Sequence, residues 1–502
     1  MKKILLILSF VVFALQLNAA EYIVKQKDIY KKSTFATLGV MVKDRHPVGK
    51  LTLIDVPEKN KAEILAEIMA DPNVEYVTEN FEIRKPKQPL SLTDLKNLKE
   101  QWANQKVNLE KAWQLAGKGS KEVRIAVIDT GVDYSHESLS TNMVEGYDFR
   151  DNDNDPMDET GARNPGHGTH CTGSIAGNGQ VDGGIAGAIP NVSIIPIRFL
   201  GADGSGDLMG GIKSIDYAIE NGAHIISASW GATIDRGRAK ALVEAVERAD
   251  KAGVIFVAAA ANDGRNNDKT EVYPANAGFA NTISVAASDV NDSKPSWSNY
   301  GKRTVHLASP GLNIMSTLPG NKYGNLSGTS MATPLVSGIV GLLKSVDPKL
   351  TGAQARALLQ ATGAKVNIET ACNCRVDAAA AVEALQKKKM LVVPMAAALD
   401  LNETVQLDVM NAKGAVSFAS SDDAILSVSE TGLVTAKAKG EARISAKDSE
   451  GNSLETLDFI VGQSSGNDGG GGGPTPPGEC PLGDPQLCEI ICGIQPDLPF
   501  CQ

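Results

Sequence analysis

Residues 123–131 read VRIAVIDTG, and this stretch decides the fold. Its apolar residues continue without the alternation of a half-exposed strand, so we expect a strand buried on both faces. Similar apolar runs follow at residues 192–200, 223–231, 253–262 and 282–288. Helical patterns lie between them, for example at 207–222 and 238–253. Strands that alternate with helices predict an α/β fold, with a parallel sheet flanked by helices.

Polar groups that can carry chemistry follow or lie near these runs. Asp129 comes directly after the first apolar run, and Asn262 ends the run at 253–262. Ligands of such sheets bind beyond the carboxyl ends of the strands, so the polar residues at these ends are the first candidates for a functional site. His167 stands in GHGTHCTG, and Ser330 stands in NLSGTSMATP. The small and apolar residues after Ser330 suggest the N-terminus of a helix, whose free N–H groups favour negative charge.

Together these residue types form a nucleophilic centre. A serine hydroxyl needs a base, histidine titrates near neutral pH, and an aspartate can orient the histidine ring. Asp129, His167 and Ser330 follow one of the chain orders in which this triad occurs. The Ser330 N–H and the Asn262 side-chain amide could stabilise an oxyanion. Taken alone, Asp129 and Asn262 are typical turn residues, while His167 and His170 lack the spacing of a helical zinc pair.

The ordered set of motifs resembles the subtilisin-like serine proteases. VIDTGVD, HGTHCTG, AAAAN and NLSGTSMATP occur in that order, together with YPANAGFANTISVAAS and WSNYG. The resemblance covers about residues 101–385. It implies that Asp129, His167 and Ser330 are the triad, with Asn262 completing the oxyanion hole. It also implies that the segment SASWG, otherwise a plain core strand, pairs with an extended peptide substrate. The residues expected to form this pairing are Ser229, Trp230 and Gly231.

The N-terminal part of the chain indicates export and processing. Residues 1–20 combine Lys2 and Lys3 with an apolar run and small residues, which predicts a secretory signal peptide. Residues 21–95 have strand and helix patterns of a small α+β unit, with Asn60 and Glu63 resembling a helix capping pair. This unit is similar to the inhibitory propeptide of the family, which implies an intramolecular inhibitor that is cut off between Phe81 and Gln101. The peptidase domain is expected at residues 96–385.

An acidic loop precedes His167 and is the best candidate for a metal site. Hard oxygen ligands suit Ca²⁺, and crowded carboxylates repel one another unless a cation lies among them. The spacing resembles a calcium loop of some subtilisin-like proteases, and a solvated acidic loop is the alternative. The candidate ligands are Asp148, Asp151, Asp153, Asp155 and Asp158.

The C-terminal part predicts further modules. Residues 390–463 have short strand patterns and turn signals, resemble a bacterial immunoglobulin-like domain, and could bind a cell-surface ligand. Residues 464–479 form a Gly/Pro-rich linker, and residues 480–502 form a Cys-rich tail. The four tail cysteines, which permit three pairings, are Cys480, Cys488, Cys492 and Cys501. We expect Cys372 and Cys374 to be too close for a mutual disulfide, and Cys171 to be a buried small residue.

Charge and composition restrict the function further. The chain has 502 residues and a net charge of −10, which argues against nucleic-acid binding. After the signal peptide we expect no membrane span. The sequence therefore predicts a secreted serine endopeptidase that is made as a self-processing zymogen and acts on protein or peptide substrates. The alternatives are a catalytically silent surface binding protein and, with less support, a metal hydrolase built on the acidic loop.

Overall fold

The computed structural model describes residues 19–31, 34–87, 101–181 and 184–462, and in the tail residues 482, 484–496, 498 and 501. Most of the predicted signal peptide, residues 88–100 of the predicted cut region between Phe81 and Gln101, the linker and Cys480 lie outside the described residues. The chain forms two compact units, one comprising Met1–Asn80 and Thr475–Gln502 and the other Phe81–Pro474. Each unit is described by itself.

A nine-stranded sheet forms the centre of the larger unit. Its strand order is β18-β19-β15-β14-β12-β10-β6-β8-β7, and all pairs are parallel except β18 with β19. The apolar runs of the sequence supply the central strands, which confirms the predicted α/β class. The strands are β6 (Gly119–Asp129), β7 (Tyr147–Asp148), β8 (Asn191–Arg198), β10 (Ile225–Ala228), β12 (Ile255–Ala259), β14 (Thr282–Ser288), β15 (Leu307–Pro310), β18 (Ala364–Lys365) and β19 (Cys374–Arg375).

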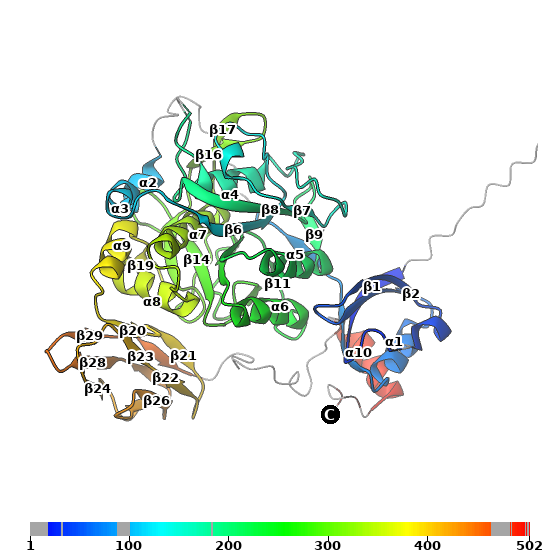
Figure 1. Cartoon of the computed structure of the whole chain (residues 1–502). Coiled ribbons are helices and arrows are strands. Elements are labelled where there is room, and N and C mark those ends of the chain that lie inside the picture. Colours follow the sequence, from blue (N-terminus) through cyan, green and yellow to red (C-terminus); the bar gives the residue numbers. More distant parts are fainter. Residues whose placement is uncertain are drawn as a thin grey trace, which may run out of the picture. The chain divides into compact units, whose positions relative to one another are not determined.

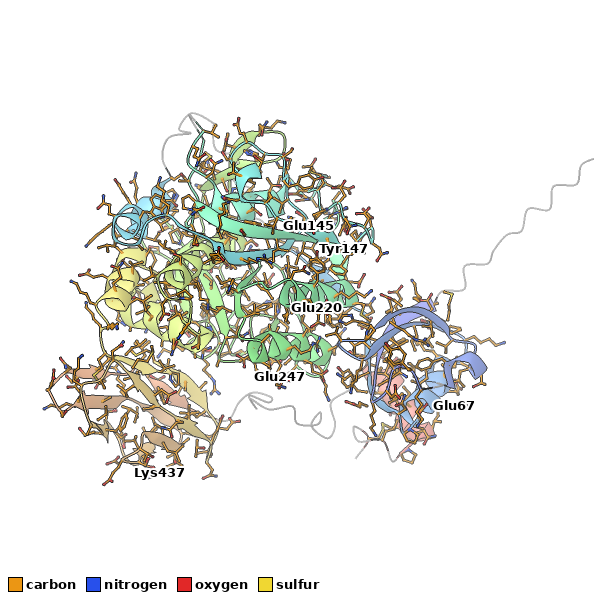
Figure 2. The ribbon with its side chains drawn as sticks, viewed as in Figure 1. Glu67, Glu145, Tyr147, Glu220, Glu247 and Lys437 are labelled. Carbon is orange, nitrogen blue, oxygen red and sulfur yellow. A yellow bond between two sulfur atoms is a disulfide. The ribbon has the colours of Figure 1, made fainter. Side chains whose placement is uncertain are left out.

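Helices α4 to α8 pack apolar faces against this sheet, whereas α2, α3 and α9 pack mainly against other helices. The helices are α2 (Trp102–Lys106), α3 (Leu109–Ala116), α4 (His167–Ala176), α5 (Leu208–Glu220), α6 (Lys240–Lys251), α7 (Thr329–Val346), α8 (Gly352–Thr362) and α9 (Ala378–Gln386), and η2 is a short 3-10 turn (Ser140–Asn142). In Figure 1, α7 and α8 lie on one side of β14, and α5 and α6 lie on the other. Charged residues such as Glu220 on α5 remain exposed (Figure 2).

The strand register brings three carboxyl ends together. Ala228 of β10 pairs with Ile128 of β6 on one side and with Ala258 of β12 on the other. Asp129, Ser229 and the residues that lead to Asn262 therefore leave the sheet at one edge. Smaller strands border this edge. They are β5 (Glu82–Arg84), β9 (Ser205–Asp207), β11 (Ala232–Thr233), β13 (Val272–Tyr273), β16 (Ile314–Leu318) and β17 (Lys322–Leu326).

The helix that carries Ser330 is long and apolar. By length and composition alone α7 could cross a membrane, and it is the one described helix that passes this test. Its residues are nevertheless mostly buried against β6, β10, β12 and β14. The helix is therefore packed as the central helix of the peptidase core.

Short strands follow the peptidase region and form an all-β domain. They pair almost entirely antiparallel, with β21 and β30 parallel, around buried residues such as Leu426, Ile444 and Phe459. The strands are β20 (Leu391–Val393), β21 (Ala397–Leu399), β22 (Thr404–Gln406), β23 (Asp408–Met410), β24 (Val416–Ser420), β25 (Leu426–Val428), β26 (Leu433–Ala436), β27 (Gly440–Ala442), β28 (Ile444–Asp448), β29 (Ser453–Glu455) and β30 (Phe459–Val461).

The smaller unit combines the two ends of the chain. Its antiparallel sheet has the order β2-β3-β1-β4, and α1 packs against it. Its elements are β1 (Ala19–Gln26), η1 (Thr34–Thr37), β2 (Met41–His46), β3 (Leu51–Pro57), α1 (Lys61–Met69), β4 (Val74–Glu79) and α10 (Pro485–Ile494). The predicted capping pair is wrong, because Asn60 is left-handed with φ 63° and its side chain makes no cap hydrogen bond.

Two disulfides are described. Cys372 and Cys374 are bonded to each other, with their Cα atoms 5.0 Å apart, so the expectation that they are too close was wrong. This separation lies within the normal range for disulfides. The two cysteines can reach it because Asn373 between them has a left-handed backbone conformation that turns the chain. In the tail, Cys492 is bonded to Cys501.

Candidate active site

Asp129 and His167 form a buried pair at the edge of the sheet. Asp129 is the last residue of β6, and His167 is the first residue of α4. The Asp129 Oδ1 lies 2.7 Å from the His167 Nδ1, and the side chains are 1% and 0% exposed. Because the carboxylate can only accept, Nδ1 carries the proton and Nε2 is left as the acceptor. The same Oδ1 accepts the Thr130 N–H at 2.7 Å, which holds the carboxylate in place.

A glycine allows this pair to form. A Cβ on Gly168 would lie 2.1 Å from the Gly131 carbonyl oxygen and 3.1 Å from the Asp129 Cβ. Any larger residue would push the first turn of α4 away from the end of β6. The N–H of Gly168 donates to the Thr130 hydroxyl at 2.9 Å, which ties the two elements together.

Ser330 is the second residue of α7 and is held by an unusual carbonyl contact. Its N–H belongs to the first turn, where backbone donors lack helical acceptors. Pro334 has no N–H, so the Ser330 carbonyl has no partner four residues later. That carbonyl instead accepts the Ser229 hydroxyl at 3.0 Å and the Cys171 thiol at 3.3 Å. Burial raises the pKa of Cys171 well above its usual value, so the thiol keeps the proton that it donates.

The Ser330 hydroxyl does not contact the histidine in this arrangement. Ser330 Oγ donates to the Ser229 carbonyl at 3.4 Å, and His167 Nε2 is buried without a partner among the described residues. Catalytic hydrogen bonds of this kind often tighten only when substrate binds.

Asn262 faces this serine with a fixed amide orientation. Its Oδ1 accepts the N–H of Thr329 at 2.9 Å and the hydroxyl of Thr329 at 2.8 Å. With the oxygen occupied, the Nδ2 points the other way as a hydrogen-bond donor. The preceding residue, Ala261, has a φ of 85°, a strained value for a residue with a Cβ. A Cβ on Gly328 would lie 3.0 Å from the Asn262 Nδ2, so a glycine keeps this donor accessible.

An extended segment of the chain lies along the site. Strand β5 pairs antiparallel with β9, and Lys85 N donates to the Gly204 carbonyl at 3.1 Å. On its other side, Arg84 exchanges backbone hydrogen bonds with Gly231 at 3.0 and 3.4 Å. Of the predicted substrate segment, Gly231 makes these strand contacts, whereas the Trp230 side chain is buried and donates to Ile128 O at 2.8 Å. Ser229 contacts Ser330 through both its hydroxyl and its carbonyl.

The described part of this segment ends at Lys87, whose backbone carbonyl contacts Asn262. The Asn262 Nδ2 donates to the Lys87 carbonyl oxygen at 3.0 Å. Upstream, Ile83 is fully buried beside Gly211, in a space that Phe199 and Trp230 also border. Burial lowers the pKa of Lys85, while the negative charge of Asp129 opposes this shift. The segment therefore lies between β9 and Gly231 and reaches Asn262 with a backbone carbonyl. Its pairing with β9 was missed because Gly-Ser-Gly-Asp carries no apolar strand signal.

The five aspartates of the acidic loop do not converge on one point. Asp148 is buried and its Oδ2 lies 2.6 Å from the Arg198 Nη1, while its Oδ1 accepts two backbone N–H groups. Asp151 reaches the same Arg198 Nη1 at 2.8 Å. Arg198 is thus a cation among these carboxylates that the sequence analysis did not identify. Asp153 and Asp155 are exposed, and each has one oxygen in a hydrogen bond, to Asp155 N and to the Tyr134 hydroxyl.

Asp158 lies behind the triad instead of in the loop. It is 5% exposed and accepts hydrogen bonds from Thr130 Oγ1, from Asn164 Nδ2, and from Thr169 N and Oγ1. Burial raises the pKa of Asp158 although these donors oppose the shift. Its oxygens are therefore engaged by the protein, and it fits a structural role better than that of a calcium ligand.

The His170 side chain contacts two backbone carbonyl groups and is not a metal ligand. Its Nε2 lies 2.9 Å from the Ile314 carbonyl oxygen and 3.1 Å from that of Gly324, so it acts as a donor. Among the described residues, the one group of side chains with metal-ligand spacing is Asp129, His167 and Cys171. Because Asp129 and His167 are already hydrogen-bonded to each other, we assign these residues to the candidate site around Ser330.

We expect acid to destabilise the peptidase through His170. Burial lowers the pKa of His170 from 6.5 to about 3, so the unfolded chain binds this proton more readily than the folded chain. The stabilising contribution is complete above pH 6.5 and is lost as the pH falls toward 3. From pH 7 to pH 4, this residue should lower the free energy of unfolding by roughly 3 kcal/mol.

This prediction can be measured by urea unfolding of the Ser330→Ala chain, followed by tryptophan fluorescence. All 4 tryptophans lie between residues 102 and 297 and report on the peptidase domain. His170→Asn keeps an N–H donor but cannot titrate, so its unfolding free energy should fall less steeply between pH 7 and pH 4. Equal slopes in the two proteins would contradict the assignment.

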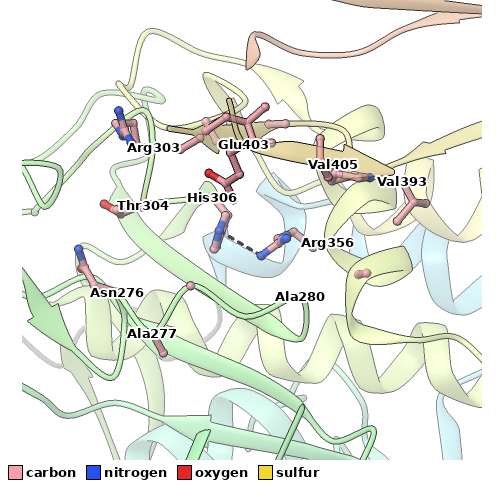
Figure 3. Close-up of a pocket in the computed structure, with 18 of the residues that line it drawn as sticks. Asn276, Ala277, Ala280, Arg303, Thr304, His306, Arg356, Val393, Glu403 and Val405 are labelled. Atoms are coloured by element: carbon pink, nitrogen blue, oxygen red, sulfur yellow. Dashed lines mark hydrogen bonds between the residues drawn. The ribbon is translucent and has the colours of Figure 1, made fainter. Parts of the chain in front are cut away.

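A cavity of about 450 Å³ lies away from the triad. Figure 3 shows His306 and Arg356 on one side of it and Glu403 and Val405 of the all-β domain on the other. Arg356 is half-buried and donates to the carbonyls of Phe279 and Thr282 at 3.1 and 2.9 Å. These contacts hold the peptidase loops, and we assign no reaction to this cavity.

Comparisons with known proteins identify two families in this chain. Residues 120–391 match the Subtilase family (Peptidase_S8), and residues 386–458 match the bacterial Ig-like domain, group 2. The chain is 41% identical to Thermitase of Thermoactinomyces vulgaris over 268 residues, which are 53% of this chain and 89% of that protein. It is 42% identical to the Major intracellular serine protease of Bacillus subtilis (strain 168) over 236 residues, 47% of this chain and 72% of that protein. It is 40% identical to the Thermophilic serine proteinase of Bacillus sp. (strain AK1) over 275 residues, 55% of this chain and 64% of that protein.

Proposed function

The chain belongs to the subtilase family of serine endopeptidases, and from this premise we propose that it is a secreted zymogen which Ser330 activates by cutting its own chain. The domains would be a signal peptide at 1–20, an inhibitory propeptide at 21–95, the peptidase at 96–385, the Ig-like domain at 390–463, a linker at 464–479 and the Cys-rich tail at 480–502. The Ig-like domain supports an extracellular or cell-surface location and could bind a surface ligand.

The proposed chemistry follows from the contacts at the edge of the sheet. Ser330 Oγ turns from the Ser229 carbonyl to His167 Nε2, which takes its proton as the oxygen attacks a peptide carbonyl. Asp129 keeps the ring in the required tautomer and stabilises the imidazolium. Asn262 Nδ2 and the Ser330 N–H hold the oxyanion. His167 then gives the proton to the leaving amine, and water releases the acyl group by the reverse sequence of proton transfers.

The observation that carries the proposal is the hydrogen bond from Asn262 to the Lys87 carbonyl. The carbonyl that accepts from an oxyanion donor is the one that the nucleophile would attack. The upstream residues pair with β9 and Gly231 on both sides, as a peptide substrate would by strand addition. The chain would therefore inhibit the site with its own residues and be cut between Lys87 and Gln88, so that the cut falls within residues 21–95 and not at their end.

The same segment suggests a substrate preference. Ile83 is buried in the space bordered by Gly211, Phe199 and Trp230, whereas Glu82 and Arg84 are exposed. An apolar residue four positions before the residue that supplies the scissile carbonyl should therefore improve peptide substrates. The main-chain contacts do not depend on side-chain type, which fits an endopeptidase that accepts many protein substrates.

We expect self-processing to leave a new N-terminus at Gln88. The folded protein should show this end in N-terminal sequencing and a matching loss in intact mass, and the Ser330→Ala chain should show neither. Cleavage of the Ser330→Ala chain, expressed and purified alone, would assign the cut to another protease. A cut far from Lys87 would mean that the Asn262 contact does not mark the scissile bond.

The acidic loop could hold one Ca²⁺ through Asp151, Asp153 and Asp155. All three are exposed and retain carboxylate oxygens that are not in the described hydrogen bonds. Arg198 pairs with both Asp148 and Asp151, but the buried Asp148 has both oxygens engaged, whereas Asp151 is exposed and keeps its Oδ1. Asp158 accepts four hydrogen bonds, so Asp148 and Asp158 fit a calcium site less well. A bound cation would cancel the repulsion within the loop and stabilise it.

We expect a chelator to lower the melting temperature of the Ser330→Ala chain by about 5 °C, since a ligand at 100 times its Kd adds about 2.7 kcal/mol. Tryptophan fluorescence with calcium or EDTA measures the shift. Asp153→Asn keeps the acceptor for Asp155 N but loses the charge, so it should reduce the calcium effect. Asp347→Asn, a charge change outside the loop, is the control. The site is wrong if both variants respond to calcium like the parent.

A further inference from the structure

The connections in the smaller unit leave room for a second helix. β1 and β2 both pair antiparallel with β3, so they run in the same direction, and β3 and β4 do so because both flank β1. A connection between such strands must cross a face of the sheet, usually with a helix. The connection from β3 to β4 contains α1, whereas the described part of the connection from β1 to β2 contains only the four-residue η1.

Helix α10, from the other end of the chain, lies beside α1 (Figure 1). Leu487, Cys488 and Ile491 of this helix are at most 5% exposed, and Ile491 is fully buried. Leu482 and Leu498 flank the helix and are also buried. These side chains share one apolar core with α1 and the sheet. The core residues contributed by the N-terminal segment include Val24, Phe35, Ile54, Leu65, Ile68 and Val77.

Several features of the tail favour a helix that is stable only when it packs against the N-terminal sheet and α1. Ten residues are too few for a stable isolated helix in water, so α10 depends on packing. The Asp484 side chain caps its N-terminus by accepting from Gln486 N and Leu487 N at 3.0 and 3.2 Å. The Cys492–Cys501 disulfide fastens the residues that follow the helix. The outward face carries Ile490, which is 55% exposed.

We propose that the Cys-rich tail is a built-in subunit of the inhibitory propeptide: α10 completes the helix layer of the N-terminal sheet and retains that segment after cleavage. That α10 retains the N-terminal segment after cleavage rests on the proposed self-processing. That α10 completes the helix layer of the sheet does not. A cut after Lys87 breaks the covalent link of the N-terminal segment to the peptidase. The tail stays covalently joined through residues 463–481, so the cut segment would remain bound through α10. Such tethering gives effective concentrations on the order of millimolar.

Hydrogen exchange in the full-length Ser330→Ala chain tests the completed fold without any catalysis. Ile491→Asp places a charge in the shared core, so amides of α1 should exchange at least about tenfold faster. Ile490→Asp, the same change on the neighbouring exposed residue, should leave α1 protected. Ile491→Ala should give an intermediate effect. Unchanged protection of β12 shows that the peptidase is folded. Equal α1 exchange in the two Asp variants would overturn the proposal.

Gel filtration of the chain with an intact Ser330 tests retention. After processing, the N-terminal fragment should co-elute with the remainder in Ile490→Asp and separate from it in Ile491→Asp, with a shorter lag before casein hydrolysis. Identical elution and lag in both variants would overturn retention. If neither variant forms a fragment, self-processing is wrong, and the exchange experiment still decides whether the tail completes the fold.

Discussion

Ser330→Ala should lower the rate of peptide hydrolysis by about 10⁶-fold, because the members of a triad act as one unit. Without the hydroxyl, His167 has no nucleophile to activate, and the buried Asp129–His167 pair has no other substrate-facing function. The remaining donors, Asn262 Nδ2 and the backbone N–H of residue 330, can still bind a carbonyl. The variant should therefore bind substrate while it fails to turn it over.

The assay must separate loss of chemistry from loss of processing. The Ser330→Ala chain keeps its inhibitory segment, so it should first be cut by a trace of active enzyme, repurified and shown to begin at Gln88. Casein hydrolysis is then compared with that of Ser337→Ala, a buried serine on the same helix whose hydroxyl bonds Thr333 O and Ser227 Oγ. Ser337→Ala should remain active. Activity in processed Ser330→Ala would refute the mechanism.

Asn262→Ala should lower kcat by about 10²–10³-fold through loss of one oxyanion donor. The Asn262 oxygen also accepts two hydrogen bonds from Thr329, so an alanine could loosen the start of α7. Asn262→Asp is the sharper variant, because it keeps an acceptor for Thr329 and replaces the N–H donor with a negatively charged oxygen that repels the oxyanion. Its kcat should fall while KM and the melting temperature change little.

A different result would assign Asn262 another role. If KM rises and kcat is unchanged, the residue binds ground-state substrate without favouring the transition state. If Asn262→Asp retains full kcat while Asn262→Ala loses it together with thermal stability, the contact with Thr329 is what matters. Either outcome would remove the Lys87 carbonyl contact as support for the cut site.

The sequence predicts the fold class well where the physical signal is local. Apolar runs such as 123–131 can only be strands buried on both faces, and they became the centre of the nine-stranded sheet. The polar residues that follow them, Asp129 and Asn262, were expected at one edge of the sheet, and the strand register brings them there. His167 and Ser330 were recognised from residue type and order, and helix N-termini bring them to the same edge.

What the sequence could not give depends on partners that are distant along the chain. Arg198 lies 50 residues after Asp148, and no local pattern joins them. The Asn60 cap failed because the backbone turned left-handed and moved the side chain away from the helix. The Cys372–Cys374 bond required a turn at Asn373 that a spacing argument misses. The docking of α10 depends on a sheet that is formed by the opposite end of the chain.

Because α1 and α10 share one core, the order in which the ribosome makes them decides when this core can be completed. About 400 residues separate the two helices, and a ribosome adds roughly 5–20 residues per second, so α10 is synthesised some 20–80 s after α1. The N-terminal sheet is made first and the peptidase second, while the last piece of the inhibitor comes only at the end. A chain whose translation stops before residue 482 would carry a whole peptidase with an incomplete inhibitor. Clearance of such unfinished chains would therefore matter to the cell that makes them.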